Sequence, residues 1–199
     1  VLAAPRDAGR GGSEENGPVS GIVEGAEVIA VVDGDTLRVR IDGGVDLVRM
    51  TGIDTPEVSG PYRDAECFGD EASRLTASLV PAGAIIALER DVSDRDPFDR
   101  LLRSVWTVGP DGSWTLINEA IVAAGAAEAR AYPPDTSYAD RLDAAETAAR
   151  SAGRGMWSAC PTGSVEIVIM ASVVRSPPTG DIPAARAIPD RTRDGAVPR

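Results

Sequence analysis

Two short clusters of acidic residues follow apolar runs in this sequence. The stretch VDGDT contains Asp33 and Asp35, and the stretch GIDTPE contains Asp54 and Glu57. Carboxylates that lie close together repel one another and cost stability unless a cation lies between them. Carboxylate oxygens are also the ligands that hard divalent cations prefer. The two clusters therefore fit a cation site, although DGD alone is also a common turn sequence.

The composition limits the chemistry that such a site can perform. The chain of 199 residues has no Lys and no His, so its 20 positive side chains are all Arg. A catalytic base must then be a carboxylate, Tyr, Cys or water, and any cation that binds phosphate must be Arg or a metal ion. Serine–histidine triads, His-ligated zinc and P-loop lysines are excluded. The net charge of −11 argues against broad electrostatic binding of nucleic acid and suits a divalent cation.

Both acidic clusters stand at the ends of predicted strands. The predicted elements are, in order, strands over 26–32, 36–41 and 45–53, a helix within 69–83, strands over 84–89 and 101–108, and helices within 115–125 and 137–153. Five short strands with a helix inserted before the fourth fit a small closed barrel of the oligonucleotide/oligosaccharide-binding (OB) type. We predict an α+β, mainly β fold, in which three helices pack outside a five-stranded barrel.

The remaining segments are predicted to be extensions of one domain. Residues 1–24, rich in Gly, Ala and charge, are predicted to be a disordered tail, and the domain is expected to occupy 25–160. In the C-terminal extension 161–199, the apolar stretch 165–174 is either an edge strand or the start of a truncated second module. The proline-rich stretch 175–199 is predicted to be disordered. No apolar run approaches the length that crosses a bilayer.

Six motifs, taken together and in order, resemble the staphylococcal nuclease (thermonuclease) family over residues 26–160. They are VVDGDT, VRMTGIDTPE, CFGDEAS, DPFDRLLRSVW, INEAIVAAGAAEARAYPPDTSY and GMWS. The resemblance implies an OB-fold phosphodiesterase that depends on Ca²⁺, acts on DNA and RNA and leaves 3′-phosphate ends. We expect a monomer whose preferred substrates are single-stranded DNA and RNA.

The resemblance also implies the cation ligands. Asp35 and Asp54 match the calcium carboxylates of the family, and the backbone carbonyl of Thr55 matches its third protein ligand. Hard oxygen donors of this kind suit Ca²⁺. Asp33 matches a nearby carboxylate that lies behind the ligands, and it is equally compatible with a plain turn residue at a strand end.

Catalytic side chains are implied by the same match. Glu57 corresponds to the residue usually assigned as general base, which agrees with the absence of His. Arg49 and Arg100 correspond to two arginines that grip the scissile phosphate, where a bidentate guanidinium suits the developing charge. Asp99 stands where the family commonly has Gly, and other arginines nearby leave the register of that loop open by a few residues.

Three residues are assigned to substrate binding. Tyr132 matches a family Tyr near the 5′ side of the nucleotide, whereas Arg130 and Phe98 each replace a Tyr. Arg130 can supply a phosphate contact with a different geometry, and Phe98 retains only stacking. All three positions also fit packing at the core or its rim. Since the lysines that some relatives place around the groove are absent, we expect weaker nucleic-acid binding.

Cys67 and Cys160 are the two cysteines of the chain. The residues alone leave open whether they are unrelated thiols or one bridge that closes a long loop. Secreted relatives often carry a Cys pair in these segments, so the resemblance favours a disulfide and a secreted or cell-envelope location. The first residues, VLAAP, fit either the remainder of a signal-peptide cleavage region or an arbitrary start.

Two classes of function compete. One is the secreted nuclease, and the other is a catalytically inactive, nuclease-like OB-fold module that only binds. A decayed copy of the enzyme is expected to have lost at least one functional residue. This sequence retains the full set, Asp35, Arg49, Asp54, Thr55, Glu57 and Arg100, which favours the enzyme.

Overall fold

Strands dominate the computed structural model, which describes residues 17–19, 23–60 and 64–160. The strands are β1 (Val23–Val31), β2 (Thr36–Ile41), β3 (Gly44–Met50), β4 (Ile53–Asp54), β5 (Ile85–Glu89), β6 (Leu101–Val108), β7 (Trp114–Leu116) and β8 (Glu128–Ala129). The helices are α1 (Gly69–Leu79), α2 (Ile117–Ala123), α3 (Ala139–Ser151) and the single-turn α4 (Met156–Ala159).

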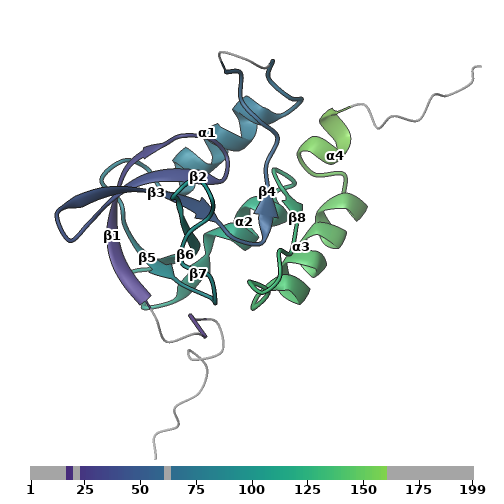
Figure 1. The fold of residues 1–199 in the computed structure, drawn as a ribbon. Helices are drawn as coiled ribbons and strands as arrows, with labels where there is room; N and C mark the ends of the chain where they lie inside the picture. The colour runs from purple at the N-terminus through teal and green to yellow at the C-terminus, as the bar shows by residue number, and fades with distance from the viewer. Residues whose placement is uncertain (1–16, 20–22, 61–63, 161–199) are drawn as a thin grey trace, which may run out of the picture. The chain divides into compact units, whose positions relative to one another are not determined.

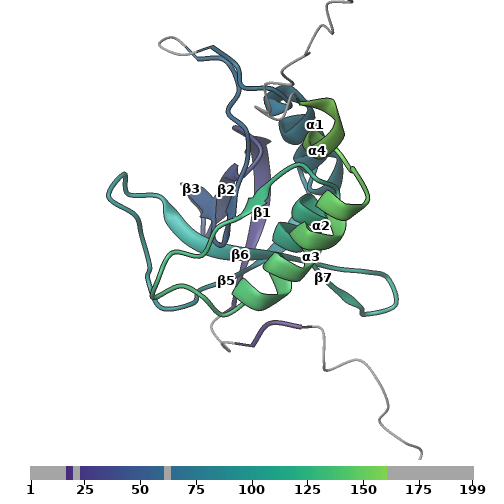
Figure 2. The ribbon, with the colours of Figure 1, turned by 90° about the vertical axis from the view of Figure 1, so that its right-hand side faces the viewer.

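Five of these strands close into a barrel. β1 pairs antiparallel with β2 and β5, β2 with β3, and β5 with β6, and a parallel pairing of β3 with β6 closes the ring. β7 extends β6 as a hairpin outside the ring. Figures 1 and 2 show α3 and α4 together on one side of the barrel, with α2 packed against both β6 and α3. The predicted mainly β, five-stranded OB-type barrel with three helices is confirmed.

The core is aliphatic and follows the alternation of the strands. Along β2, Leu37 and Val39 are fully buried, whereas Arg38 and Arg40 on the other face are exposed. Burying one aliphatic side chain of this size contributes about 1.5–3 kcal/mol. The many such residues around the barrel therefore fix the strands whose ends carry the acidic clusters.

The predicted strand over 45–53 is interrupted in the structure. β3 ends at Met50, and Gly52 then takes a φ of 77°, a left-handed conformation that Gly adopts without strain. The chain next forms β4, which pairs antiparallel with β8 instead of continuing the barrel. The GIDTPE stretch is thereby carried out of the barrel toward residues 128–130.

The predicted helix within 115–125 begins later than its sequence suggests. Thr115 and Leu116 belong to β7 because they pair with Thr107 and Trp106 on β6. The helix itself starts at Ile117. A strand pairing thus overrides the helical spacing of the first two residues.

The predicted N-terminal tail overlaps with structured residues. β1 begins at Val23, which pairs with Glu89 on β5, so the domain starts earlier than residue 25. Val19 donates its backbone NH to the Glu89 carboxylate (2.7 Å) and to the Tyr138 hydroxyl (3.1 Å). The prediction of disorder through residue 24 is therefore wrong for these positions.

The C-terminal extension 161–199 lies outside the described residues, as does the strand predicted within it at 165–174. Within the described part of the chain, none of the helices has both the length and the apolar character that crossing a membrane requires.

Cys67 and Cys160 form a disulfide, with their Cα atoms 5.8 Å apart. This confirms the pairing that the resemblance implied. Cys67 precedes α1 and Cys160 follows α4, so the bridge fastens the end of the helical layer to the segment between GIDTPE and α1.

Candidate active site

VDGDT forms the turn between β1 and β2. The backbone NH groups of Val32 and Asp33 donate to the Thr36 carbonyl (2.8 and 3.4 Å), and the Asp33 carboxylate accepts from the Asp35 NH (3.1 Å). A carboxylate that accepts from an NH two residues later is ordinary turn chemistry. Asp33 therefore has the turn contact that its sequence allows, directly beside Asp35.

Asp35 is the buried carboxylate of the site, with 2% of its surface exposed. Its Oδ2 accepts from both the backbone NH (3.0 Å) and the hydroxyl (3.1 Å) of Thr55. Gly34 makes this approach possible, because a Cβ at that position would lie 2.6 Å from the Thr55 hydroxyl oxygen. The two acidic clusters thus touch directly, through Asp35 and Thr55.

Arg49 places one guanidinium group between the two acidic clusters. The β2–β3 register sets Arg49 opposite Thr36, next to Asp35. Nη1 pairs with the Asp35 carboxylate, and Nη2 donates to Asp54 (2.9 Å) and to the Ile53 carbonyl (3.2 Å). The Arg49 side chain is only 18% exposed. A single guanidinium group thereby pairs with both carboxylates.

Asp54 is held by a second arginine, which directly follows the opposite strand β8. The pairing of Asp54 with Glu128 brings the residues after β8 alongside, and the Arg130 Nη1 donates to the Asp54 Oδ2 (2.9 Å). The pKa of the Arg130 guanidinium is raised by its hydrogen bond with Tyr132 and by the charge of Asp54. Asp54 thus accepts from one guanidinium on each of its two oxygens.

Asp35 and Asp54 have the donor chemistry of a site for a hard divalent cation. Both carboxylates face the same positive group, Arg49, and the Thr55 backbone lies beside them. Two carboxylates and one carbonyl leave coordination positions for water and phosphate, as Ca²⁺ allows. Among residues 17–19, 23–60 and 64–160, no group of three or more His, Cys, Asp and Glu side chains could hold a metal ion by itself.

Glu57 lies three residues beyond Asp54 and is fixed through its backbone. Its NH donates to the Glu66 carboxylate (3.0 Å), and its carbonyl accepts from the Glu66 NH (2.9 Å). Glu66 is the neighbour of Cys67, so the disulfide lies one residue from this contact. The arrangement holds the Glu57 backbone at the edge of the site.

Arg100 is held by the loop that precedes β6. The Asp96 carboxylate accepts from the Arg100 Nε (2.7 Å) and from the backbone NH groups of Phe98 and Arg100 (both 2.9 Å). Burial raises the pKa of Asp96, but these hydrogen bonds outweigh it and hold that pKa below its ordinary value of 3.8. Asp99 has a φ of 65°, a conformation that Asp tolerates better than most residues.

The neighbouring arginines have partners of their own. Arg103 is buried and pairs with Asp94 (2.8 Å), so it serves the fold. Arg95 pairs with Asp46 (2.9 Å) from β3.

A cleft of about 470 Å³ opens beside these residues, and its lining includes Arg49, Arg95, Arg100 and Tyr132. The Tyr132 ring is exposed at its rim, and the Phe98 ring is 80% exposed next to Arg100, whose guanidinium carbon lies 5.6 Å from the ring centre. Three guanidinium groups beside exposed aromatic rings can bind a phosphate and an adjacent base.

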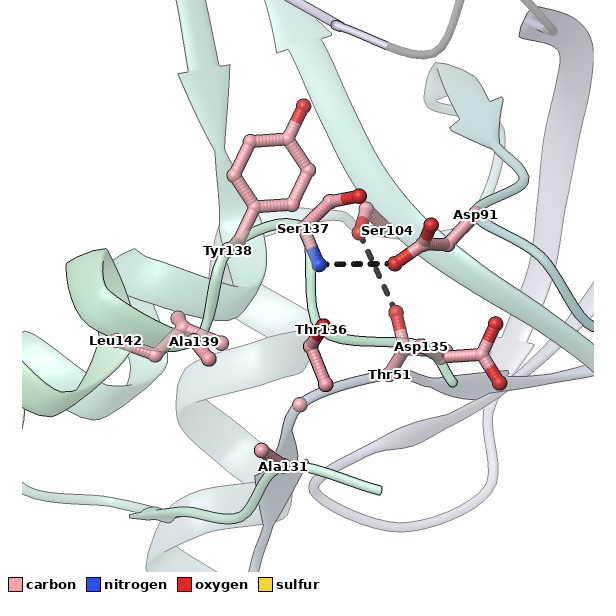
Figure 3. Close-up of a pocket in the computed structure, with 11 residues that line it drawn as sticks. Thr51, Asp91, Ser104, Ala131, Asp135, Thr136, Ser137, Tyr138, Ala139 and Leu142 are labelled. Atoms are coloured by element: carbon pink, nitrogen blue, oxygen red, sulfur yellow. Dashed lines mark hydrogen bonds between the residues drawn. The ribbon is translucent and has the colours of Figure 1, made fainter. Parts of the chain in front are cut away.

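The loop that carries Arg130 and Tyr132 is anchored to the barrel. Figure 3 shows the Ser137 backbone nitrogen facing the Asp91 carboxylate (2.9 Å), and the hydroxyls of Thr51 and Ser104 facing each other (3.3 Å). The space that these residues enclose is only about 10 Å³, room for about one water molecule at most. This small cavity is too small for a substrate, and it lies where the loop that carries Arg130 and Tyr132 packs against the barrel.

The family model described as staphylococcal nuclease homologue matches residues 47–159, more than half of the chain. The chain belongs to the staphylococcal nuclease family. The family places it among the nucleases, which are hydrolases.

Three relatives illustrate the similarity. The chain is 34% identical to the thermonuclease of Staphylococcus hyicus over 132 residues, which cover 66% of this chain and 75% of the relative. It is 38% identical to the SPbeta prophage-derived endonuclease YokF of Bacillus subtilis over 128 residues, covering 64% of this chain and 42% of the relative. It is 36% identical to the endonuclease YncB of Bacillus subtilis, again over 128 residues, which are 64% of this chain and 58% of the relative.

Three features of this nuclease escaped the sequence reasoning. The role of Gly34 was not predicted, because DGD is a common turn sequence. A Gly can also mark a close approach between two segments, here between Gly34 and the Thr55 side chain. Glu66 carried no signal, because its partner is the backbone of Glu57. The contact of Arg130 with Asp54 depends on the β4–β8 pairing. This pairing was not predicted, because strands of two residues have no recognisable sequence pattern.

Proposed function

We propose that this nuclease is a Ca²⁺-dependent extracellular enzyme that hydrolyses phosphodiester bonds in DNA and RNA. The observation that carries the proposal is the convergence of Asp35 and Asp54 on Arg49, with Thr55 against Asp35. Glu57 follows Asp54 by three residues in the sequence. The relatives that are named thermonuclease and endonuclease support the class of substrate.

The proposed ligands of Ca²⁺ are the carboxylates of Asp35 and Asp54 and the carbonyl of Thr55. When bound, the ion draws electron density from a phosphate oxygen and makes the phosphorus easier to attack. Asp33 supports the ligands from behind, through its hydrogen bond with the Asp35 NH.

Glu57 accepts the proton of the attacking water. The water oxygen forms a bond to phosphorus in line with the 5′ oxygen, whose bond to phosphorus breaks. The 5′ oxygen takes a proton from solvent, which leaves a 3′-phosphate and a 5′-hydroxyl. Arg49 and Arg100 donate to the phosphoryl oxygens, on which negative charge accumulates during the attack.

Tyr132, Phe98 and Arg130 contact the nucleotides next to the scissile phosphate. Exposed rings can stack on unpaired bases, whereas the bases of a duplex are already stacked on one another, so single-stranded DNA and RNA are the proposed substrates. We propose a monomer that is secreted or attached to the cell envelope. The Cys67–Cys160 disulfide supports an oxidising compartment.

The experiment that tests this function is hydrolysis of denatured DNA by the purified protein, first with Ca²⁺ and then with excess EGTA. We expect cleavage with Ca²⁺, loss of cleavage with EGTA and 3′-phosphate ends on the products. Glu57→Gln should lower turnover by about 10²–10⁴-fold at unchanged thermal stability. Glu71→Gln, at an exposed position on α1, is the matched control. Absence of cleavage with Ca²⁺ at both low and high salt would refute the enzyme and favour the inactive binding module.

A further inference from the structure

The cation site of this chain contains as many arginines as carboxylates. Asp54 accepts from Arg49 on Oδ1 and from Arg130 on Oδ2, both at 2.9 Å. Asp35 accepts from Thr55 on Oδ2 and pairs with Arg49 through Oδ1. Two negative and two positive side chains therefore cancel, and the oxygens that would bind a cation already have positively charged partners.

A divalent cation entering this site must compete with the two arginines. It would add two positive charges next to Arg49 and Arg130, and like charges at such short range repel. The repulsion is relieved if a guanidinium leaves the carboxylate and meets a negative group elsewhere. A substrate phosphate supplies that negative group, and the guanidinium fork is suited to it.

The two arginines differ in how easily they can move. The Arg49 side chain is 18% exposed and also bonds the Ile53 carbonyl, whereas the Arg130 side chain is 50% exposed. Arg130 follows directly after β8 and stands two residues from Tyr132 on the rim of the cleft. Arg130 can therefore turn from Asp54 toward bound nucleotide at little structural cost.

We propose that Arg130 and Arg49 are built-in counterions of the cation site, and that Arg130 sets the affinity for the divalent cation. The cation displaces guanidinium from Asp54, and the released guanidinium binds substrate phosphate. Cation and phosphate thus strengthen each other's binding. This inference rests on the proposed function and adds a second role for Arg130, as a counterion of the cation site.

The test is calorimetric titration of Ca²⁺ into the full chain without nucleic acid. Removing one positive charge about 6 Å from a doubly charged ion raises its affinity by on the order of tenfold in water, and exposure and salt reduce this. Arg130→Gln should therefore bind Ca²⁺ about three- to tenfold more tightly than wild type, with a smaller difference at high salt. Arg130→Lys keeps the charge and should stay close to wild type.

Arg74→Gln is the matched control, because Arg74 is exposed on α1 and its removal changes the net charge equally. The coupling is measured with deoxythymidine 5′-monophosphate, titrated with and without Ca²⁺. By reciprocity, the gain in nucleotide affinity caused by Ca²⁺ equals the gain in Ca²⁺ affinity caused by the nucleotide. This gain should be smaller in Arg130→Gln than in wild type or Arg74→Gln.

Equal or weaker Ca²⁺ binding by Arg130→Gln, compared with Arg74→Gln, would overturn the inference while leaving the nuclease proposal intact. A wild-type protein that neither binds Ca²⁺ nor cleaves with it would overturn both. An undiminished coupling in Arg130→Gln would show that the released guanidinium does not reach the phosphate, and would overturn the inference as well.

Discussion

Removal of the Cys67–Cys160 disulfide should lower the free energy of unfolding by about 4.7 kcal/mol. The bridge joins residues that are 93 positions apart in the sequence. In the chain-entropy model, a cross-link over a loop of this length lowers the entropy of the unfolded chain. At 25 °C this loss of entropy destabilises the unfolded state by about 4.7 kcal/mol of free energy. The free energy of unfolding of an ordinary domain is about 5–15 kcal/mol, so the loss would be a large share of this free energy.

The native fold should survive this change, because α4 has other ties to the domain. Met156 is buried, and its backbone NH donates to the Gly125 carbonyl (2.8 Å). The Arg150 guanidinium lies 3.9 Å from the centre of the Trp157 ring. The double variant Cys67→Ser/Cys160→Ser should therefore fold, and its loss of stability should arise mainly in the unfolded state.

Urea unfolding followed by tryptophan fluorescence measures the loss, since Trp106 is fully buried in the folded chain. The variant should unfold at lower urea and with a steeper dependence on urea, because an unfolded chain without the cross-link exposes more surface. Wild type under reducing conditions should behave like the variant. A loss below about 1.5 kcal/mol with an unchanged urea dependence would refute the entropic reasoning.

Three further predictions concern residues around the site. Gly34→Ala brings a Cβ to 2.6 Å from the Thr55 hydroxyl and should lower the free energy of unfolding, measured with urea, by about 1–3 kcal/mol. It should also weaken Ca²⁺ binding in calorimetry, and a variant with neither effect would mean that Thr55 can move freely. Phe98→Ala should leave the unfolding free energy within about 0.5 kcal/mol of wild type, yet raise the KM for denatured DNA by about fivefold or more if the ring stacks on bases; an unchanged KM would exclude stacking. Burial raises the pKa of Asp96, but hydrogen bonds from Arg100 and Phe98 outweigh burial and hold this pKa below 3.8 in the folded chain. Ionised Asp96 therefore stabilises the fold above pH 3.8, and this contribution disappears as the pH falls through the pKa of Asp96 in the folded chain. Asp96→Asn should therefore flatten the fall in unfolding free energy between about pH 5 and pH 2, and equal slopes for both proteins would contradict this.

Elements with a strong local pattern were predictable from the sequence. The strand predicted over 36–41 is observed as Thr36–Ile41, and the one over 101–108 is observed as Leu101–Val108. A strand is indicated by alternating apolar residues, and its end by Gly or Pro. Both signals lie within a few positions of each other, so they can be recognised from the sequence alone.

Contacts between distant segments were not predictable in the same way. The parallel pairing of β3 with β6 closes the barrel, and the two-residue strands β4 and β8 pair outside it. Strands this short have no periodicity to recognise. The resemblance nominated Arg130 for substrate binding, but its ion pair with Asp54, 76 positions away, follows only from the β4–β8 register.

The two acidic clusters can lie together because one arginine has the geometry to pair with both of them. Arg49 uses two separate nitrogens, with Nη1 on Asp35 and Nη2 on Asp54 and the Ile53 carbonyl. A planar, forked guanidinium can face two carboxylates at once, whereas the point charge of a lysine ammonium does not present paired donors in a fixed plane. The same fork matches the oxygens of a phosphate. A chain without lysine therefore has, at Arg49, a group that holds two carboxylates together and that, under the proposed function, also binds the substrate phosphate.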